Sequence, residues 1–147
     1  MFLDALNDVP DIVMEFLEYH STVRGHSDKT VFAYYTDLKI LFRFLKKRRH
    51  LVPNDVPFNE IDILDIDIDF IKSIKIEELY RYQSFSPELS NSNASLSAAS
   101  RCRRTSTVKS FFNLFIVALK IFELIFVLIA KMGRIKPIFV CFHISHR

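Results

Sequence analysis

The stretch SDKTVFAYYTDLKILFRFLKKRR, residues 27–49, decides the fold class of this chain. Its apolar residues recur at steps of three and four, which is typical of a helix with one buried face. Ser27 can accept a backbone N–H of the first turn, and the cations at 46–49 complement the carbonyl end of the helix dipole. The buried stripe is predicted to contain Val31, Tyr34, Leu38, Leu41 and Leu45, with Thr36, Lys39, Arg43 and Lys46 facing outward.

The segments before and after this helix predict further helices. Apolar residues follow Pro10 at helical spacing, and Gly25 is suited to end that helix. Residues 61–70 are ambiguous, because they alternate like a strand and also step like a helix. No second strand signal exists with which they could pair, so we expect short helices there, followed by a helix over 77–85.

Residues 86–97 are rich in Ser and Asn and predict a loop, after which another helix begins near Ser97. The inner face of that helix is predicted to consist of Ala98, Cys102, Thr105, Val108 and Phe112, with Arg101, Arg104 and Lys109 facing outward. The whole pattern predicts an all-α chain.

The composition of the 147 residues excludes several classes of protein. Two glycines are too few for dinucleotide and phosphate-loop folds, in which backbone must approach a phosphate closely. Two cysteines exclude a disulfide scaffold and zinc modules with four cysteines. The N-terminus has neither a basic start nor a long apolar run, so we expect no secretory signal and a cytoplasmic location.

The net charge of +3 is unevenly distributed along the chain. Residues 1–50 carry a net charge of +1, residues 51–90 carry −6 and residues 91–147 carry +8. A basic C-terminal third favours a polyanion or a membrane surface as the partner.

The C-terminal part differs sharply from the rest, and we expect domains over 1–114 and 115–147. In residues 111–130, 15 of 20 side chains are Leu, Ile, Phe or Val, and they surround the helix. About 20 such residues can span a membrane. These side chains favour insertion by roughly 5–9 kcal/mol, whereas Lys120 and Glu123 each oppose it by about 2.5–3.5 kcal/mol. The two charges are three residues apart and can pair, so insertion is marginal.

Two motifs resemble the core-binding domain of tyrosine recombinases, the family of the phage integrases and the Xer-like enzymes. The first motif is similar to the family signature S-x-x-T-x-x-x-Y-x-x-D-L. Its matching residues are Ser27, Thr30, Tyr34, Asp37 and Leu38. Residues 97–112 resemble the last helix of that domain, and residues 63–80 lie where the family has short middle helices. The resemblance covers about residues 8–114.

This resemblance implies a SAM-like unit of four helices that forms half of a clamp around duplex DNA, with its second and fourth helices near the major groove. Cations on those helices neutralise phosphates and release condensed counterions, and contacts to base edges add sequence preference. The candidate DNA-contact residues are Lys29, Thr30, Lys39 and Arg43 from the second helix, and Ser97, Arg101, Arg104 and Lys109 from the fourth.

The catalytic residues of the family are missing from this sequence. The resemblance implies a tyrosine nucleophile, an arginine pair, a lysine and one or two histidines, all in a separate C-terminal domain. No tyrosine follows Tyr82, and Arg147 stands four residues after His143, where the family has a spacing of three. We therefore expect a protein that binds DNA without cutting it. We interpret the tail as the product of a shifted reading frame in a truncated recombinase gene.

Other chemistry is not indicated. The aspartates of 65–69 are spaced like the start of an EF-hand loop, but Phe70 stands where that loop needs glycine. Cys141, His143 and His146 offer three ligands for a soft metal, and we interpret them as a chance cluster. We expect no metal, no cofactor and no small-molecule substrate.

Two other interpretations stay open. The first is a small membrane-anchored protein with a helical head and one C-terminal membrane-spanning helix, residues 111–130. The second is a helical interaction protein with no role in nucleic-acid binding. Salt-dependent duplex binding by residues 1–110 argues against the second, and its absence at low salt argues for it.

Overall fold

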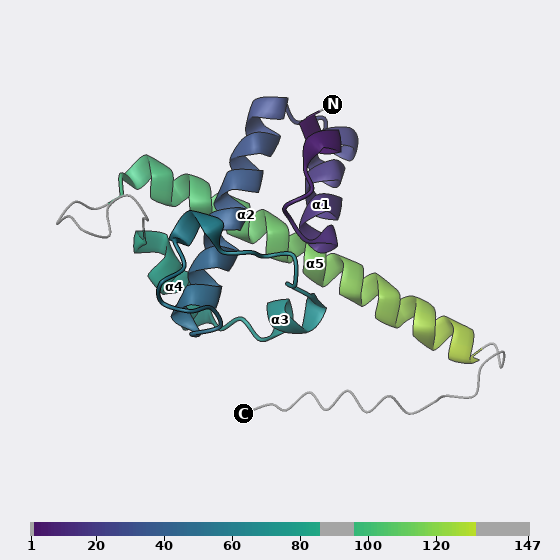
Figure 1. The fold of residues 1–147 in the computed structure, drawn as a ribbon. Coiled ribbons are helices and arrows are strands. Elements are labelled where there is room, and N and C mark those ends of the chain that lie inside the picture. The colour runs from purple at the N-terminus through teal and green to yellow at the C-terminus, as the bar shows by residue number, and fades with distance from the viewer. Residues whose placement is uncertain (1, 86–95, 132–147) are drawn as a thin grey trace. The chain divides into compact units, whose positions relative to one another are not determined.

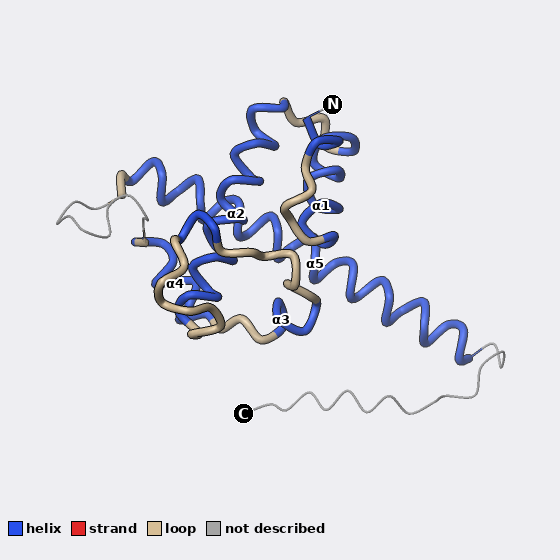
Figure 2. The backbone as a smooth tube through the Cα atoms, in the orientation of Figure 1, coloured by secondary structure: helices blue, strands red, loops and turns tan. Residues whose placement is uncertain are grey.

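The computed structural model describes residues 2–85 and 96–131, and no strand occurs within these ranges. The all-α prediction is therefore confirmed for the described chain (Figures 1 and 2). The elements in order are the 3-10 helix η1 (Phe2–Ala5), α1 (Asp11–Glu18), the π-helix η2 (Tyr19–Val23), α2 (Asp28–Arg48), the 3-10 helix η3 (Phe58–Glu60), α3 (Ile68–Lys72), α4 (Ile76–Ser84) and α5 (Ala98–Lys131).

Most predicted helices are present. In the ambiguous run at 61–70, residues 61–67 form neither helix nor strand, so the expected short helices are limited to α3, which begins at Ile68. The helix predicted over 77–85 is present as α4. Of the predicted loop over residues 86–97, positions 86–95 lie outside the described residues. The π-helical turn η2 was not predicted, because no simple sequence signal marks an i→i+5 turn.

The chain divides into two compact units, Met1–Phe111 and Phe112–Arg147. The predicted domain boundary after residue 114 falls three residues beyond this division. α5 begins in the first unit and continues into the second.

The corner between α1 and α2 forms through local capping. Gly25 follows η2 with a φ of +63°, a left-handed conformation that glycine adopts without a steric penalty. Ser27 then has an extended backbone, and its side chain accepts the Thr30 backbone N–H at 3.3 Å. The predicted start of α2 is therefore confirmed, together with the chemistry that sets it.

The core of the first unit forms around the apolar stripe of α2. Leu38 of that stripe is fully buried, as is Tyr82 of α4, and Phe16 of α1 is 2 % exposed. Phe111 of α5 completes this core, with ring centroids 5.4 Å from Phe16 and 5.9 Å from Phe42. Such edge-to-face ring pairs add to the free energy gained from apolar burial alone. Each long helix thus contributes large side chains to one core.

The buried face of α5 differs from the predicted one. Of the predicted inner residues, Ala98 and Cys102 are exposed and only Val108 is buried. The observed inner face consists of Arg104, Thr107, Val108 and Phe111. Two of these four side chains are polar, so the spacing of apolar residues alone predicted the wrong buried face for this helix.

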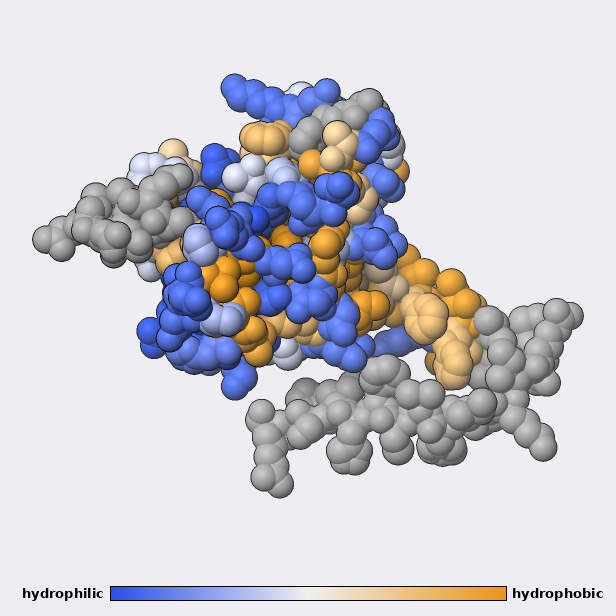
Figure 3. Space-filling model, viewed as in Figure 1, coloured by the Kyte–Doolittle hydropathy of each residue, from blue (hydrophilic) through white to orange (hydrophobic). Residues whose placement is uncertain are grey.

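The second unit is described here only through the end of α5. From Ile116 to Leu128 its large apolar side chains are exposed except Leu119, which is half-buried, and Figure 3 shows orange residues along this part of the helix. By length and composition, α5 is the single described helix that is able to cross a membrane.

Candidate nucleic-acid interface

Asp37 holds three helices of the first unit together. Its carboxylate is 1 % exposed and accepts two hydrogen bonds from the Arg103 guanidinium, at 3.1 and 2.8 Å. Thr107 donates to the same carboxylate at 2.9 Å, and the Tyr82 hydroxyl donates to the Asp37 carbonyl at 2.8 Å. The burial of this charge is tolerated because it is paired and hydrogen-bonded. These bonds fix α2 against α5 and α4, as the crossing of α2 and α5 in Figure 1 illustrates.

Arg104 lies on the inner face of α5, so the expectation that it faces outward is wrong. It is 4 % exposed, its guanidinium donates to the Phe85 carbonyl, and it lies 5.2 Å from the centre of the Tyr82 ring. Burial also raises the pKa of Tyr82, which stays protonated as a hydrogen-bond donor. Arg104 thereby connects α5 to the end of α4.

Lys39 on α2 is bound to the N-terminal segment of the same chain. Its Nζ atom lies 2.6 Å from the Asp8 carboxylate and 2.9 Å from the Tyr35 hydroxyl. Burial raises the pKa of Asp8, but hydrogen bonds from Lys39 and Tyr35 outweigh this and hold that pKa below its usual value. Burial lowers the pKa of Lys39, and its bonds to Asp8 and Tyr35 outweigh this, so the net shift is upward.

The two cations that follow Lys39 on the same side of α2 also have partners within the chain. Arg43 donates through Nε to the Ile61 carbonyl at 3.0 Å. Lys46, expected to face outward, is 6 % exposed and bonds to Asp65 at 2.6 Å and to the Asp62 carbonyl at 2.8 Å. The segment after η3 therefore covers this part of α2, which the sequence pattern did not predict.

Three predicted contact residues have exposed side chains. Lys29, Arg101 and Lys109 form no side-chain hydrogen bond or ion pair with the described residues. Lys29 lies in the first turn of α2, and Arg101 lies in the first turn of α5. Each belongs to a helix start at which the partly positive end of the dipole adds to the charge of the cation.

The two predicted hydroxyl residues act as helix caps or lie beside one. Ser97 is exposed, and its Oγ accepts the Ser100 backbone N–H at 3.2 Å, so it caps α5 as Ser27 caps α2. Thr30 is half-buried and lies 3.1 Å from the Ser27 hydroxyl, measured between oxygens. Through Asp37 the structure joins the two helices, α2 and α5, that carry seven of the eight predicted residues, and the eighth, Ser97, caps α5.

Sequence reasoning did not select Arg103 as a site residue. Its side chain pairs with Asp37 yet remains 51 % exposed, so part of the guanidinium faces solvent between α2 and α5. The only sequence signal was its place in a run of three arginines among residues 101–104, which does not reveal an ion pair across the fold.

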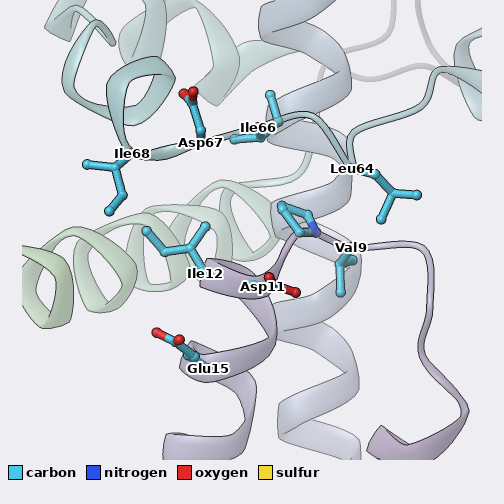
Figure 4. A pocket seen from close by; sticks show the side chains of 9 residues that line it. Val9, Asp11, Ile12, Glu15, Leu64, Ile66, Asp67 and Ile68 are labelled. Carbon is cyan, nitrogen blue, oxygen red and sulfur yellow. The ribbon is translucent and has the colours of Figure 1, made fainter.

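A cavity of about 350 Å³ lies on the first unit between α1 and the segment before α3. Figure 4 shows Ile12 and Ile68 in its lining, with Asp11, Glu15 and Asp67 around them. Three carboxylates repel phosphate, so this cavity is unsuited to nucleic acid.

A metal centre is not indicated either. The described residues contain no group of three or more His, Cys, Asp and Glu side chains able to hold a metal ion. The three soft-ligand residues of the C-terminal tail, Cys141, His143 and His146, lie outside the described residues.

The fold and the exposed cations define a small helical module with two capped helix starts, each carrying one exposed cation, although Asp28 shares the first turn of α2 with Lys29. Over 112 residues the chain is 46 % identical to a protein named tyrosine recombinase XerC from Caldanaerobacter subterraneus subsp. tengcongensis. The similarity covers 76 % of this chain but 30 % of that relative. No known family model matches the chain, and no solved structure matches it. The comparison supports a relationship to tyrosine recombinases, in agreement with the motifs at 27–38 and 97–112.

Proposed function

We propose that the first unit binds duplex DNA as the core-binding, SAM-like part of a tyrosine recombinase, without cutting the DNA. The observation that carries this proposal is the 46 % identity to a recombinase over three quarters of the chain. The all-α fold supports it, because α2 and α5 both begin with a capped turn that carries an exposed cation, Lys29 in α2 and Arg101 in α5. Double-stranded DNA is the proposed partner, in the cytoplasm.

The eight candidate residues divide into two groups by their contacts. Lys29, Arg101 and Lys109 are exposed and are the proposed phosphate contacts, with Thr30 and Ser97 beside them at the two helix starts. The remaining candidates, Lys39, Arg43 and Arg104, have partners within the fold, and we propose that they position the helices. Arg103 joins the first group, because half of its side chain is exposed between α2 and α5.

The proposal of binding without cutting has two supports. The aligned part amounts to 30 % of the relative, so most of that protein has no counterpart in the alignment. The last tyrosine in the sequence, Tyr82, is fully buried and hydrogen-bonded to Asp37, so it is inaccessible to a phosphodiester. A nucleophile must reach the reacting phosphorus, and this hydroxyl does not.

The first test measures the affinity of the full chain for a 30-base-pair duplex of arbitrary sequence by fluorescence anisotropy over a range of salt concentrations. Affinity should fall with salt, with a log–log slope of about −0.9 for each phosphate contact. Replacing Lys29, Arg101 and Lys109 with Ala should weaken binding about 10- to 100-fold at low salt and reduce the slope by roughly 2–3.

The matched control replaces three other exposed cations, Lys47, Arg48 and Arg81, which lie at the end of α2 and on α4. This variant loses the same net charge and should keep most of the affinity. If the two variants lose equal affinity for the duplex, binding depends on the net charge of the chain and not on this interface. If the unsubstituted chain shows no salt-dependent binding to the duplex, that result contradicts the proposed function.

A further inference from the structure

The second half of α5 exposes apolar side chains on every side. Five consecutive residues, Leu124 to Leu128, are all large and apolar, and each is 44–61 % exposed. Successive residues of a helix are rotated by about 100°, so five in a row surround the axis. Among the described side chains of this half, the large apolar residues that are exposed are Ile116, Val117, Ile121, Phe122, Leu124, Ile125, Phe126, Val127 and Leu128.

The distribution of these side chains selects the kind of partner. A protein groove or one partner helix covers a single stripe of a helix, about 100° wide in a soluble protein. Here such a partner leaves the remaining faces in water. A lipid bilayer contacts a helix on all sides at once, and in a bilayer the helix satisfies its backbone hydrogen bonds internally.

The length of the apolar part fits the same partner. Residues 112–131 are 20 positions long, which at 1.5 Å per residue spans about 30 Å, the thickness of the hydrocarbon core. An 18-residue window of this helix has high mean hydropathy and no more than two charged residues, and 6 % of it is buried. A cation lies before the apolar part at Lys109 and another is its last residue, Lys131, and long side chains at these two ends reach the headgroup region.

Two charged residues lie within the apolar part. Lys120 and Glu123 are three positions apart, a spacing that makes them neighbours on one face of a helix. Opposite charges at this spacing can pair, which reduces the penalty of placing them in hydrocarbon. The polar Asn113 lies on the same face as Lys120, seven positions earlier, so the polar groups form a narrow stripe.

We propose that residues 112–131 of α5 insert into a lipid bilayer as a single membrane-spanning helix, so that the first unit is held at a membrane surface. This goes beyond the proposed binding of DNA and does not depend on it. A second copy of the helix is the competing partner, and the test separates the two.

The test expresses the full chain in bacteria and measures the fraction retained in membranes after an alkaline carbonate wash. The protein is then purified in detergent and reconstituted with neutral phosphatidylcholine vesicles for flotation. We expect most of the chain to resist the wash and to float with the vesicles. Replacing Phe122 and Ile125 with Arg should lower the retained fraction at least 10-fold, because both charges enter the apolar part.

The matched control places the same two charges in the first unit, at Val23 and Leu51, which are 70 % and 55 % exposed. That variant should remain in the membrane as the unsubstituted chain does. Release of the unsubstituted chain by carbonate overturns the proposal, as does binding only to anionic vesicles that salt reverses. A chain that stays in the aqueous phase as a dimer, or that sediments without floating, overturns it as well.

Discussion

The two ends of α5 lie in one continuous helix but differ in how they are stabilised. Near its start, α5 buries two polar residues: Arg104 is bonded to the Phe85 carbonyl just after α4, and Thr107 is bonded to Asp37 on α2. After Phe112 the helix exposes most of its described large apolar side chains. Secondary structure is the same in both parts, so backbone hydrogen bonds alone do not explain the difference. What differs is the surroundings: the first part is packed within a folded unit, and the second exposes most of its large apolar side chains.

The largest expected effect compares equal truncations in the two regions. Leu41→Ala removes a fully buried side chain from the core and should lower the free energy of unfolding of the first unit by about 2–5 kcal/mol. Leu124→Ala removes a side chain that is 61 % exposed and should change it by less than about 0.5 kcal/mol. Urea unfolding of the full chain in mild detergent, followed by circular dichroism, measures both. Similar losses for the two variants contradict the division into two units.

The next effect concerns the buried carboxylate that fixes α2 to α5. Asp37→Ala leaves Arg103 and Thr107 without their acceptor, and we expect the free energy of unfolding to fall by about 2–3 kcal/mol. Arg103 is half exposed and can bind water, which keeps the loss below that of a fully buried pair. Asp55→Ala, at an exposed position, is the control in the same urea experiment. An unchanged midpoint for Asp37→Ala shows that this carboxylate does not hold the helices together.

The third effect is a dependence of stability on pH in the first unit. Burial, with His26 and Arg24 nearby, lowers the pKa of His20 to about 4 from its usual 6.5. Between these values the unfolded chain binds more protons than the folded one, so stability should decrease as pH falls from about 6.5 to 4. The resulting loss in the free energy of unfolding is on the order of 1–2 kcal/mol. It is kept to this size because water reaches the partly exposed His26 beside His20 and screens the charge.

His20→Phe tests this effect, because it keeps an aromatic ring against Phe16 and Tyr34 and removes the titrating group. The variant should lose the slope of stability against pH within that window. Asp8 and Glu78 have lowered pKa values, so their stabilisation is lost only as pH falls below their ordinary values of 3.8 and 4.5, at or beyond the acidic end of this window, and the variant and the unsubstituted chain share that loss. A variant with the same slope as the unsubstituted chain contradicts the assignment to His20.

The smallest effect separates the bound cations of α2 from the exposed ones. Lys39→Ala removes a partly exposed ion pair with Asp8 and should lower the free energy of unfolding by about 0.5–1 kcal/mol with little effect on DNA affinity. Lys29→Ala should leave stability nearly unchanged and weaken duplex binding. Urea unfolding and anisotropy on the same two variants check this. If Lys39→Ala instead weakens duplex binding and leaves stability unchanged, Lys39 breaks its ion pair with Asp8 in order to contact DNA.

Local patterns predicted most of the helices correctly. The start of α2 follows from Ser27, and the end of the preceding segment follows from Gly25, because capping and backbone conformation depend on near neighbours. The phase of α5 was predicted wrongly because two buried positions are polar. Arg104 and Thr107 become inner residues only when Phe85 and Asp37 are brought beside them.

The sequence by itself determined the all-α class, the helix starts and the apolar character of α5, since each of these arises from residues within a few positions of one another. Only the tertiary structure decided which cations are exposed at the candidate interface. The Lys39 partner lies 31 residues away in the chain and the Arg103 partner 66 residues away. No local pattern encodes such pairs, because the packing of distant helices creates them.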